Sequence, residues 1–207
     1  INYAADGGLY AELVQNRGFE YNPSDKLGSD KNWNSRKAWS VINTESFQID
    51  SISPVHPNNK HYAVLQVDKK GTALINEGFD GIPVKSGEKY NFSVFARTPE
   101  SNTGPLIIRL IDKLGNTVAE SRTKKLSKNW VKYEVVLTAK ETVPDTKISI
   151  EPQIIGRVDL DMISLFPQKT FKGRRNGMRA DIAQTLADMK PTFVRFPGGC
   201  VAHGDGL

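Results

Sequence analysis

The sequence is poor in cysteine and has no long apolar run, and each of these absences excludes a class of protein. Its 207 residues include one cysteine, Cys200, which excludes an intrachain disulfide framework and a cysteine-based zinc cluster. No stretch approaches the run of about 20 apolar residues that a transmembrane helix needs, so we expect no membrane partner. Hydrophobic residues (38%) and charged residues (25%) occur in the proportions of a globular protein rather than a disordered or collagen-like one.

Positive charge is also not concentrated on the body of the chain. The formal net charge of the chain is +5. Residues 169–207 carry seven basic and three acidic residues, a net charge of +4, whereas the other 168 residues carry 21 basic and 20 acidic residues, a net charge of +1. A protein that binds a polyanion is expected to show a basic stripe interleaved with aromatic residues or glycine. The sequence has no such stripe, so we expect no nucleic-acid partner.

The body of the chain, from about residue 38 to 166, has the pattern of an antiparallel β protein. Short runs rich in β-branched and aromatic residues are separated by turn residues, and polar and apolar residues alternate clearly over 90–97 and 130–135. Such alternation is typical of strands with one buried and one wet face. Roughly ten strands with no helices between them predict a β-sandwich or barrel. The predicted strands are 38–42, 47–52, 62–67, 73–79, 89–97, 106–111, 117–123, 131–138, 147–152 and 158–166.

The two flanks of this body have a different pattern. Residues 8–17 predict a short amphipathic helix, because Leu9 and Leu13 lie four apart and Gly18 suits a C-terminal cap. After residue 167, apolar residues recur at helical spacing over 178–190 and are followed at once by a short apolar run at 192–196.

A helix followed directly by an apolar strand is half of a parallel αβ unit. One strand cannot form a sheet alone. We therefore expect the chain to be a piece of a larger protein, in which the β-sandwich is set between the first helix and the second strand of an α/β barrel.

Two blocks of sequence resemble a known family. Residues 1–20, including GGLYAELVQNRGFE, and residues 171–200, including FKGRRNGMR and FVRFPGGC, resemble the α-L-arabinofuranosidases of glycoside hydrolase family 51, in the branch with an inserted β-sandwich. The insert is similar to carbohydrate-binding module family 4/9 at residues 18–20, 87–90 and 160–167.

The resemblance covers essentially the whole chain and implies a mainly β fold. It implies a jelly-roll-type, galactose-binding-like antiparallel sandwich (19–168), inserted in the truncated start of a TIM (β/α)8 barrel. Residues 1–18 would be the end of barrel strand 1 and the first helix, and residues 169–207 a barrel helix and the second strand.

By this resemblance the parent protein is a retaining enzyme that releases terminal arabinofuranosyl groups from plant cell-wall polysaccharides such as arabinan and arabinoxylan, outside the cell or in a periplasm. Such enzymes use two carboxyl groups, which in this family lie on later barrel strands. We therefore expect no catalytic residue here, an inactive fragment and no organic cofactor. Glu12 and Glu20 are not assigned a catalytic role. The alternative is a stand-alone carbohydrate-binding or structural module. The oligomeric state is left open.

Four residues match the family's substrate-binding wall. Arg195 would hold a carboxylate ionised, or it could form an ion pair that stabilises the barrel. Gly198 and Gly199 would let the backbone approach a ligand, or they could form an ordinary turn. Cys200 would line the arabinose subsite, or it could be a small buried apolar residue.

Sugar rings stack on aromatic side chains, and two are candidates in the insert. Trp33 is flanked by polar residues, and Tyr62 follows a segment with two prolines that could equally be a solvated turn. Trp39 and Trp130 begin predicted strands and are interpreted as core or edge packing. The sandwich could also have lost sugar binding and serve as a structural brace.

Two further groups of charged residues are candidates for binding ions. Glu20 and Asp161 match acidic positions of the module near its first and last strands, and the resemblance implies a structural calcium held by them. Each could instead be a surface carboxylate. The basic residues at 172–179 are interpreted as a solvated or ion-paired connector, with phosphate recognition as the alternative.

Overall fold

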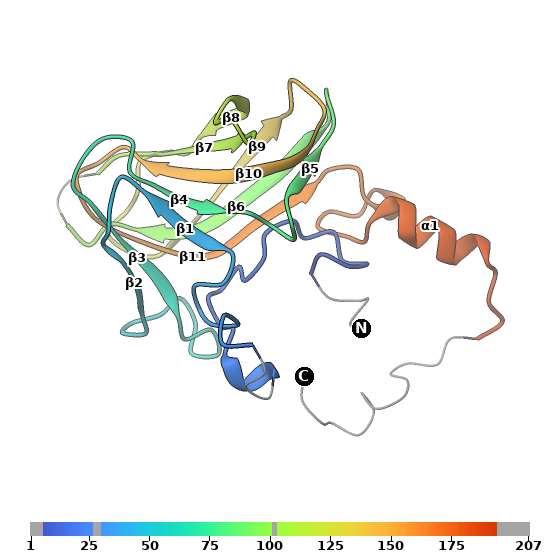
Figure 1. The fold of residues 1–207 in the computed structure, drawn as a ribbon, viewed down its shortest axis with the longest axis horizontal. Coiled ribbons are helices and arrows are strands. Elements are labelled where there is room, and N and C mark those ends of the chain that lie inside the picture. The colour runs from blue at the N-terminus through green and yellow to red at the C-terminus, as the bar shows by residue number, and fades with distance from the viewer. Residues whose placement is uncertain (1–5, 27–29, 101–102, 194–207) are drawn as a thin grey trace.

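A computed structural model describes residues 6–26, 30–100 and 103–193. Two antiparallel sheets pack face to face as a β-sandwich, and one α-helix of the described chain stands beyond an end of the sandwich (Figure 1). The prediction of a mainly β, antiparallel sandwich is confirmed. The boundaries predicted for the insert and its flanks stay predictions.

Each sheet is built from strands that are distant in sequence. The first has the order β1-β4-β10-β7-β8, with β5 paired to β10, and the second has the order β2-β3-β11-β6-β9. The first sheet contains β1 (Trp39–Ile42), β4 (Ala73–Asn76), β5 (Ile82–Val84), β7 (Leu106–Ile111), β8 (Thr117–Arg122) and β10 (Val143–Pro152). The second contains β2 (Phe47–Asp50), β3 (Tyr62–Val67), β6 (Lys89–Arg97), β9 (Val131–Thr138) and β11 (Gly156–Pro167).

The apolar residues of the alternating pattern form the core of the sandwich. In β6, Phe92, Val94 and Ala96 are buried, while the residues between them are half-buried. They meet buried residues of the facing sheet in one hydrophobic cluster that includes Ile108 and Ile148. Burying a side chain of this size stabilises the fold by about 1.5–3 kcal/mol. All ten predicted strands are present, with ends shifted by a few residues.

One strand, β5, was not predicted. Pro83 lies at its centre, between the buried residues Ile82 and Val84. Proline has no backbone N–H to donate to a neighbouring strand and is confined to edge strands and bulges. The sequence around Pro83 therefore does not predict a strand. Among the described strands, β5 pairs with β10 alone, and the Thr146 hydroxyl donates to the Ile82 carbonyl at 2.7 Å.

The prediction of a helix over residues 8–17 is wrong. Residues 8–17 run as turns and extended chain, and their backbone groups form hydrogen bonds with other segments. Leu13 N donates to Leu165 O at 3.0 Å, and Ile163 N donates to Arg17 O at 2.9 Å. Tertiary partners therefore replace the local hydrogen bonds that a helix would need, and β11 becomes buried on both faces.

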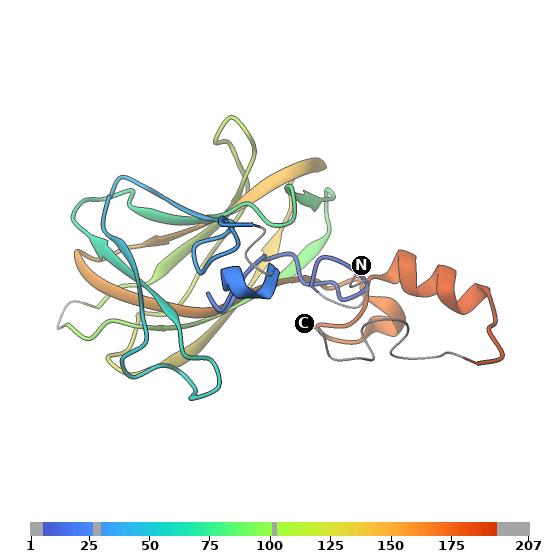
Figure 2. The ribbon, with the colours of Figure 1, turned by 60° about the horizontal axis from the view of Figure 1, so that its bottom comes forward.

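The second flank follows the prediction over its described part. The helix α1 (Ala180–Asp188) lies within the predicted range 178–190, and two short 3₁₀ turns, η1 (Pro23–Lys26) and η2 (Phe171–Gly173), complete the elements of the described chain. The strand predicted at 192–196 falls mainly outside the described residues. Figures 1 and 2 both place α1 beyond the end of the sandwich, with the N-terminal segment between them. None of the helices described has the length and apolar character needed to cross a bilayer.

Candidate functional site

The two flanks of the sandwich meet at a junction, although more than 160 residues separate them in sequence. Ala11 N donates to Gly177 O at 3.2 Å, and Arg179 N donates to Leu9 O at 2.9 Å. Tyr10 and Met178 form an antiparallel bridge between these bonds. The structure therefore places side by side the segments that the sequence assigns to one interrupted domain.

Glu12 fastens the N-terminal segment to β11. Its side chain is fully buried. Oε1 accepts hydrogen bonds from Leu165 N (2.8 Å) and Val14 N (3.1 Å), and Oε2 accepts from the Ser164 hydroxyl (2.5 Å). The Arg17 guanidinium lies 3.5 Å away. Burial raises the pKa of Glu12 to about 7, although these hydrogen bonds and Arg17 oppose that rise.

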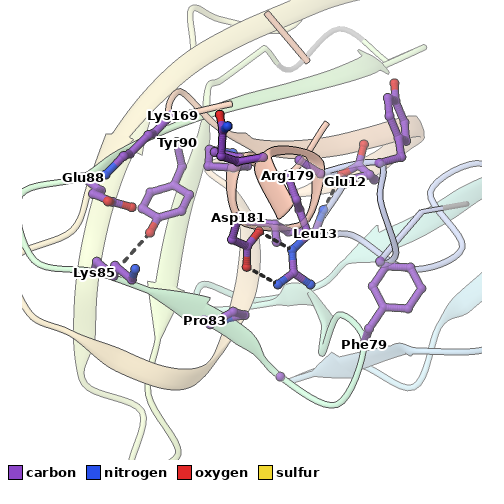
Figure 3. A pocket seen from close by; sticks show the side chains of 17 residues that line it. Glu12, Leu13, Phe79, Pro83, Lys85, Glu88, Tyr90, Lys169, Arg179 and Asp181 are labelled. Carbon is purple, nitrogen blue, oxygen red and sulfur yellow. Dashed lines mark hydrogen bonds and ion pairs between the residues drawn. The ribbon is translucent and has the colours of Figure 1, made fainter. Parts of the chain in front are cut away.

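A cavity of about 640 Å³ opens at the junction (Figure 3). Three parts of the chain line it: the N-terminal segment, the region from Phe79 to Tyr90, and the region from Pro167 to Gln184. A volume of several hundred cubic ångströms is typical of pockets that bind small molecules. This junction cavity is therefore a candidate binding site that the sequence did not predict.

An ion pair on the cavity wall fixes the start of α1. Arg179 Nη2 lies 2.7 Å from Asp181 Oδ2, and Arg179 Nε donates to Asp181 Oδ1 at 3.2 Å (Figure 3). The hydrogen bonds from Arg179 lower the pKa of Asp181, and those to Asp181 raise the pKa of Arg179. Both groups therefore remain charged over the ordinary pH range.

Glu20 and Asp161, predicted to bind calcium, are linked through the loop that contains Asn59 and His61. Asn59 Nδ2 donates to both Asp161 oxygens (3.1 and 2.9 Å), and Met162 N donates to Oδ1 at 2.7 Å. Glu20 Oε1 accepts from His61 N, and Oε2 lies 2.7 Å from His61 Nδ1. Burial is the main reason that the pKa of Asp161 is raised to about 7.

This donor set only partly suits calcium, which takes about six to eight oxygen ligands. Both carboxylates already accept hydrogen bonds, and the described part of the chain contains no grouping of three or more His, Cys, Asp or Glu residues that could hold a metal ion. The structural calcium stays a prediction. Heat on calorimetric titration with calcium and a raised melting temperature would support it, and the absence of both would remove it.

The two aromatic candidates differ in their surroundings. Trp33 is partly exposed and stacks on Tyr21, with ring centroids 4.1 Å apart and an interplanar angle of 11°, so it stays a candidate for sugar stacking. Tyr62 is buried, with an exposed fraction of 0%, an environment that favours packing over sugar stacking, and its binding role stays a prediction. The Tyr62 hydroxyl donates to Ile52 O at 2.6 Å, and the Trp130 ring packs edge-on against the Tyr62 ring.

The other two tryptophans pack as expected. Trp39 is buried, and its indole N–H donates to Asn16 O at 2.9 Å. Trp130 is half-buried beside the edge strand β9, with the Arg97 guanidinium 4.5 Å from its ring centroid. Arg97 also bonds the fully buried Asp159, so the face of β3, β6 and β11 carries an interlocked cluster of charged and aromatic groups.

The basic connector is exposed and in part ion-paired. Arg175 Nη2 lies 2.8 Å from Glu134 Oε1, Arg179 pairs with Asp181, and the ammonium of Lys172 lies 5.4 Å from the Phe171 ring centroid. This matches the interpretation as a solvated or ion-paired connector.

Arg195, Gly198, Gly199 and Cys200 lie outside the described residues, so their roles stay predictions. The structure adds Glu12 and the junction cavity, to which the sequence analysis assigned no role. The signal that could have indicated Glu12 is an acidic residue within the apolar run from Leu9 to Val14, since a carboxylate in such a run needs buried partners.

Known proteins resemble the chain over nearly its whole length. No protein-family model matches it. It is 37% identical over 204 residues to an extracellular exo-α-L-arabinofuranosidase of Streptomyces chartreusis, covering 98% of this chain and 23% of that protein. It is 34% identical over 223 residues to α-L-arabinofuranosidase 1 of Arabidopsis thaliana, covering 100% of the chain and 31% of that protein.

Solved structures are also similar to the chain. An arabinose-bound GH51 α-L-arabinofuranosidase superimposes with a TM-score of 0.80 and 33% identity, covering 96% of this chain and 33% of that one. A CBM22–GH10 xylanase fragment of Clostridium thermocellum, with a TM-score of 0.53 and 14% identity over 77% of this chain and 29% of that one, shares the fold alone. The chain thus spans about a quarter to a third of the relatives it matches. Within those limits, the chain is similar, in sequence and in fold, to part of the α-L-arabinofuranosidases of glycoside hydrolase family 51.

Proposed function

We propose that the chain is the N-terminal part of an enzyme that releases terminal α-L-arabinofuranosyl groups from plant polysaccharides, with retention of configuration. The observation that carries this proposal is the similarity of almost the whole chain to α-L-arabinofuranosidases, in sequence and in fold. The curated relatives are three to four times longer than the matched region, so most of such an enzyme would lie in other segments.

The chemistry requires two carboxyl groups about 5–5.5 Å apart, one as acid and base and one as nucleophile. Neither Glu12 nor Asp181 suits this purpose, because Glu12 is fully buried and bonded to the backbone of β11, and Asp181 pairs with Arg179. The catalytic pair is therefore assigned to segments outside this sequence, and the chain alone should be inactive.

This chain would contribute part of the substrate-binding wall. Arg195 would keep a catalytic carboxylate ionised through charge and a bidentate contact. Gly198 and Gly199 would let the backbone approach the sugar, and Cys200 would line the arabinose subsite. The sandwich would act as an accessory domain that binds saccharide or braces the barrel. Substrates would be arabinan or arabinoxylan, and the Streptomyces relative, named as extracellular, favours action outside the cell.

A stand-alone carbohydrate-binding or structural module is the second candidate. It is favoured by the complete hydrophobic core between the two sheets, which does not depend on the flanks for most of its members. Such a module would bind saccharide without hydrolysing it.

Hydrolysis of an aryl α-L-arabinofuranoside separates the two candidates. The full-length protein should release arabinose from it, and the 207-residue chain should release none. A full-length protein that binds saccharides but leaves this substrate intact would favour the module instead.

A further inference from the structure

The segment that joins β8 to β9, residues 121–133, concentrates the positive charge of the sandwich, and we call it the basic crossover. It contains five basic residues and no acidic one, a net charge of +5. The other 155 residues of 1–168 contain 16 basic and 20 acidic residues, a net charge of −4. The near-neutral total of residues 1–168 therefore conceals a basic stripe on an otherwise acidic body, contrary to the expectation from the averaged charge.

Hydrogen bonds and two buried side chains fix the backbone of the basic crossover. Leu126 N donates to Gly104 O at 2.8 Å, and Leu106 N donates to the Thr123 hydroxyl at 2.9 Å. Thr123 and Leu126 are buried, whereas the two lysines between them are exposed. The fold therefore presents these lysines to solvent from a backbone that is held on both sides.

Four exposed cations of the basic crossover form no side-chain hydrogen bond or ion pair within the described ranges. They are Arg122, Lys124, Lys125 and Lys128. The acidic residues that flank the crossover in sequence are engaged by other cations. Glu120 Oε2 lies 2.6 Å from Arg109 Nε. Glu134 Oε1 lies 2.9 Å from Lys132 Nζ and 2.8 Å from Arg175 Nη2. The four cations are therefore available to an external anion.

The basic crossover lies at the end of the sandwich opposite α1. It bonds to Gly104, which precedes β7, and Leu106 at the start of β7 pairs with Pro152 at the end of β10. Figure 1 shows that β10 runs away from α1. A ligand on the basic crossover would thus contact the sandwich at a distance from the junction and its cavity.

The chemistry of this surface fits a polyanion that has no bases. A group of unpaired cations attracts a chain of repeated negative charges. Trp130 is not free to stack on a base, because its indole N–H donates to Ser53 O at 3.0 Å and the Arg97 guanidinium lies 4.5 Å from its ring centroid. Single-stranded nucleic acids are bound through such stacking as well as through charge, so the surface favours an acidic polysaccharide.

We propose that the basic crossover binds a polysaccharide that carries carboxylate groups along its chain, a polyuronate. The proposal rests on the proposed function for the polysaccharide class, since uronate carboxylates are the usual anionic groups of plant polysaccharides. It goes beyond that function, because the arabinofuranosyl groups to be released carry no charge. Electrostatic attraction at the basic crossover would hold the protein on acidic regions of its polymeric substrate.

Calorimetric titration of the 207-residue chain with a linear oligogalacturonate tests this proposal. We expect binding that weakens as the salt concentration rises from about 0.01 M to about 1 M, because the Debye length falls from about 30 Å to about 3 Å. The methyl ester of the same oligosaccharide should not bind, since it keeps the sugar chain and lacks the charges. No binding of the oligogalacturonate, binding that does not depend on salt, or equal binding of the ester would overturn the proposal.

Two variants with the same change in net charge locate the binding surface. The first replaces the four unpaired cations by glutamine: Arg122→Gln, Lys124→Gln, Lys125→Gln and Lys128→Gln. It should weaken binding about tenfold or more, because four exposed ion pairs with the ligand are lost. The matched control replaces four exposed lysines near the junction: Lys85→Gln, Lys89→Gln, Lys140→Gln and Lys169→Gln. It should bind nearly as well as the unmodified chain, and an equal loss in both variants would refute the location.

A single-stranded oligodeoxynucleotide of matched charge tests the other class of polyanion. It should bind more weakly than the oligogalacturonate, and equal or tighter binding would overturn the proposal in favour of a nucleic-acid surface. The aryl arabinofuranoside assay of the full-length protein separates this proposal from the proposed function. Hydrolysis without oligogalacturonate binding refutes only the basic crossover as a binding surface, and oligogalacturonate binding without hydrolysis refutes only the enzyme.

Discussion

Replacing Glu12 by glutamine should remove most of one pH-dependent contribution to stability while keeping the contact that holds the N-terminal segment. The glutamine carbonyl can accept from Leu165 N and Val14 N, as Glu12 Oε1 does now. Its amide can donate to the Ser164 hydroxyl, which donates to Glu12 Oε2 in the present structure. The shape of the side chain and its buried position are thus preserved, and the titrating proton is lost.

The magnitude follows from the two pKa values. Burial raises the pKa of Glu12 from 4.5 to about 7 in the folded chain, so between these values the folded state holds a proton that the unfolded state has released. Stabilisation from this group is complete below pH 4.5 and is lost as the pH rises through about 7. A tenfold change in an acid constant is about 1.4 kcal/mol, so the full loss is about 3 kcal/mol.

Urea denaturation of the 207-residue chain and its Glu12→Gln variant, followed by circular dichroism from about pH 4.5 to about pH 8, measures this effect. The pKa of Asp161 is also raised to about 7, so both proteins should lose stability as the pH rises, and their difference isolates Glu12. The exposed Glu141→Gln serves as control and should follow the unmodified chain. Parallel pH profiles for the chain and its Glu12→Gln variant would refute the reasoning.

Three other substitutions test separate contacts by denaturation. Asp159→Asn should destabilise the chain by about 3–5 kcal/mol, because this fully buried carboxylate lies 2.7 Å from two guanidinium nitrogens; a loss below 1 kcal/mol would contradict the buried cluster. Gly7→Ala should lower the free energy of unfolding by about 1–2 kcal/mol because of its φ of +76°, and by a further amount because the new Cβ would contact the Phe79 ring. Gly87→Ala is its control, since Gly87 has a φ of +78° and nothing within 4 Å of an added Cβ, so only the backbone contribution should appear. Equal losses in the two variants would refute the close contact between Gly7 and Phe79. Tyr62→Phe should cost about 1 kcal/mol for the lost hydrogen bond to the Ile52 carbonyl; an unchanged free energy of unfolding would contradict that bond.

The sandwich could be predicted from the sequence because its strands carry their own signal. Alternation such as that of residues 89–97 arises whenever one face of a strand is buried, and it located ten strands. β5 lacks this signal, since three residues around Pro83 gain their order only from pairing with β10. The helix predicted over residues 8–17 failed because apolar spacing describes which residues are buried but not what they are buried against.

The site was less accessible to sequence reasoning. Glu12 and Ser164 lie 152 residues apart, and no local pattern in a single sequence records their contact. The junction cavity combines residues from three distant segments, among them Phe79 and Gln184, whose proximity is a product of the fold. The partial exposure of Trp33, by contrast, could be predicted from its polar neighbours, and its role in sugar stacking stays a prediction.

The stereochemistry of hydrolysis by the full-length protein is the most direct test of the proposed activity. Proton NMR of the reaction on an aryl α-L-arabinofuranoside should show the α-anomer of arabinose as the first product, before mutarotation, as expected for a retaining enzyme. Release of the β-anomer first, or no release of arabinose at all, would contradict the assignment.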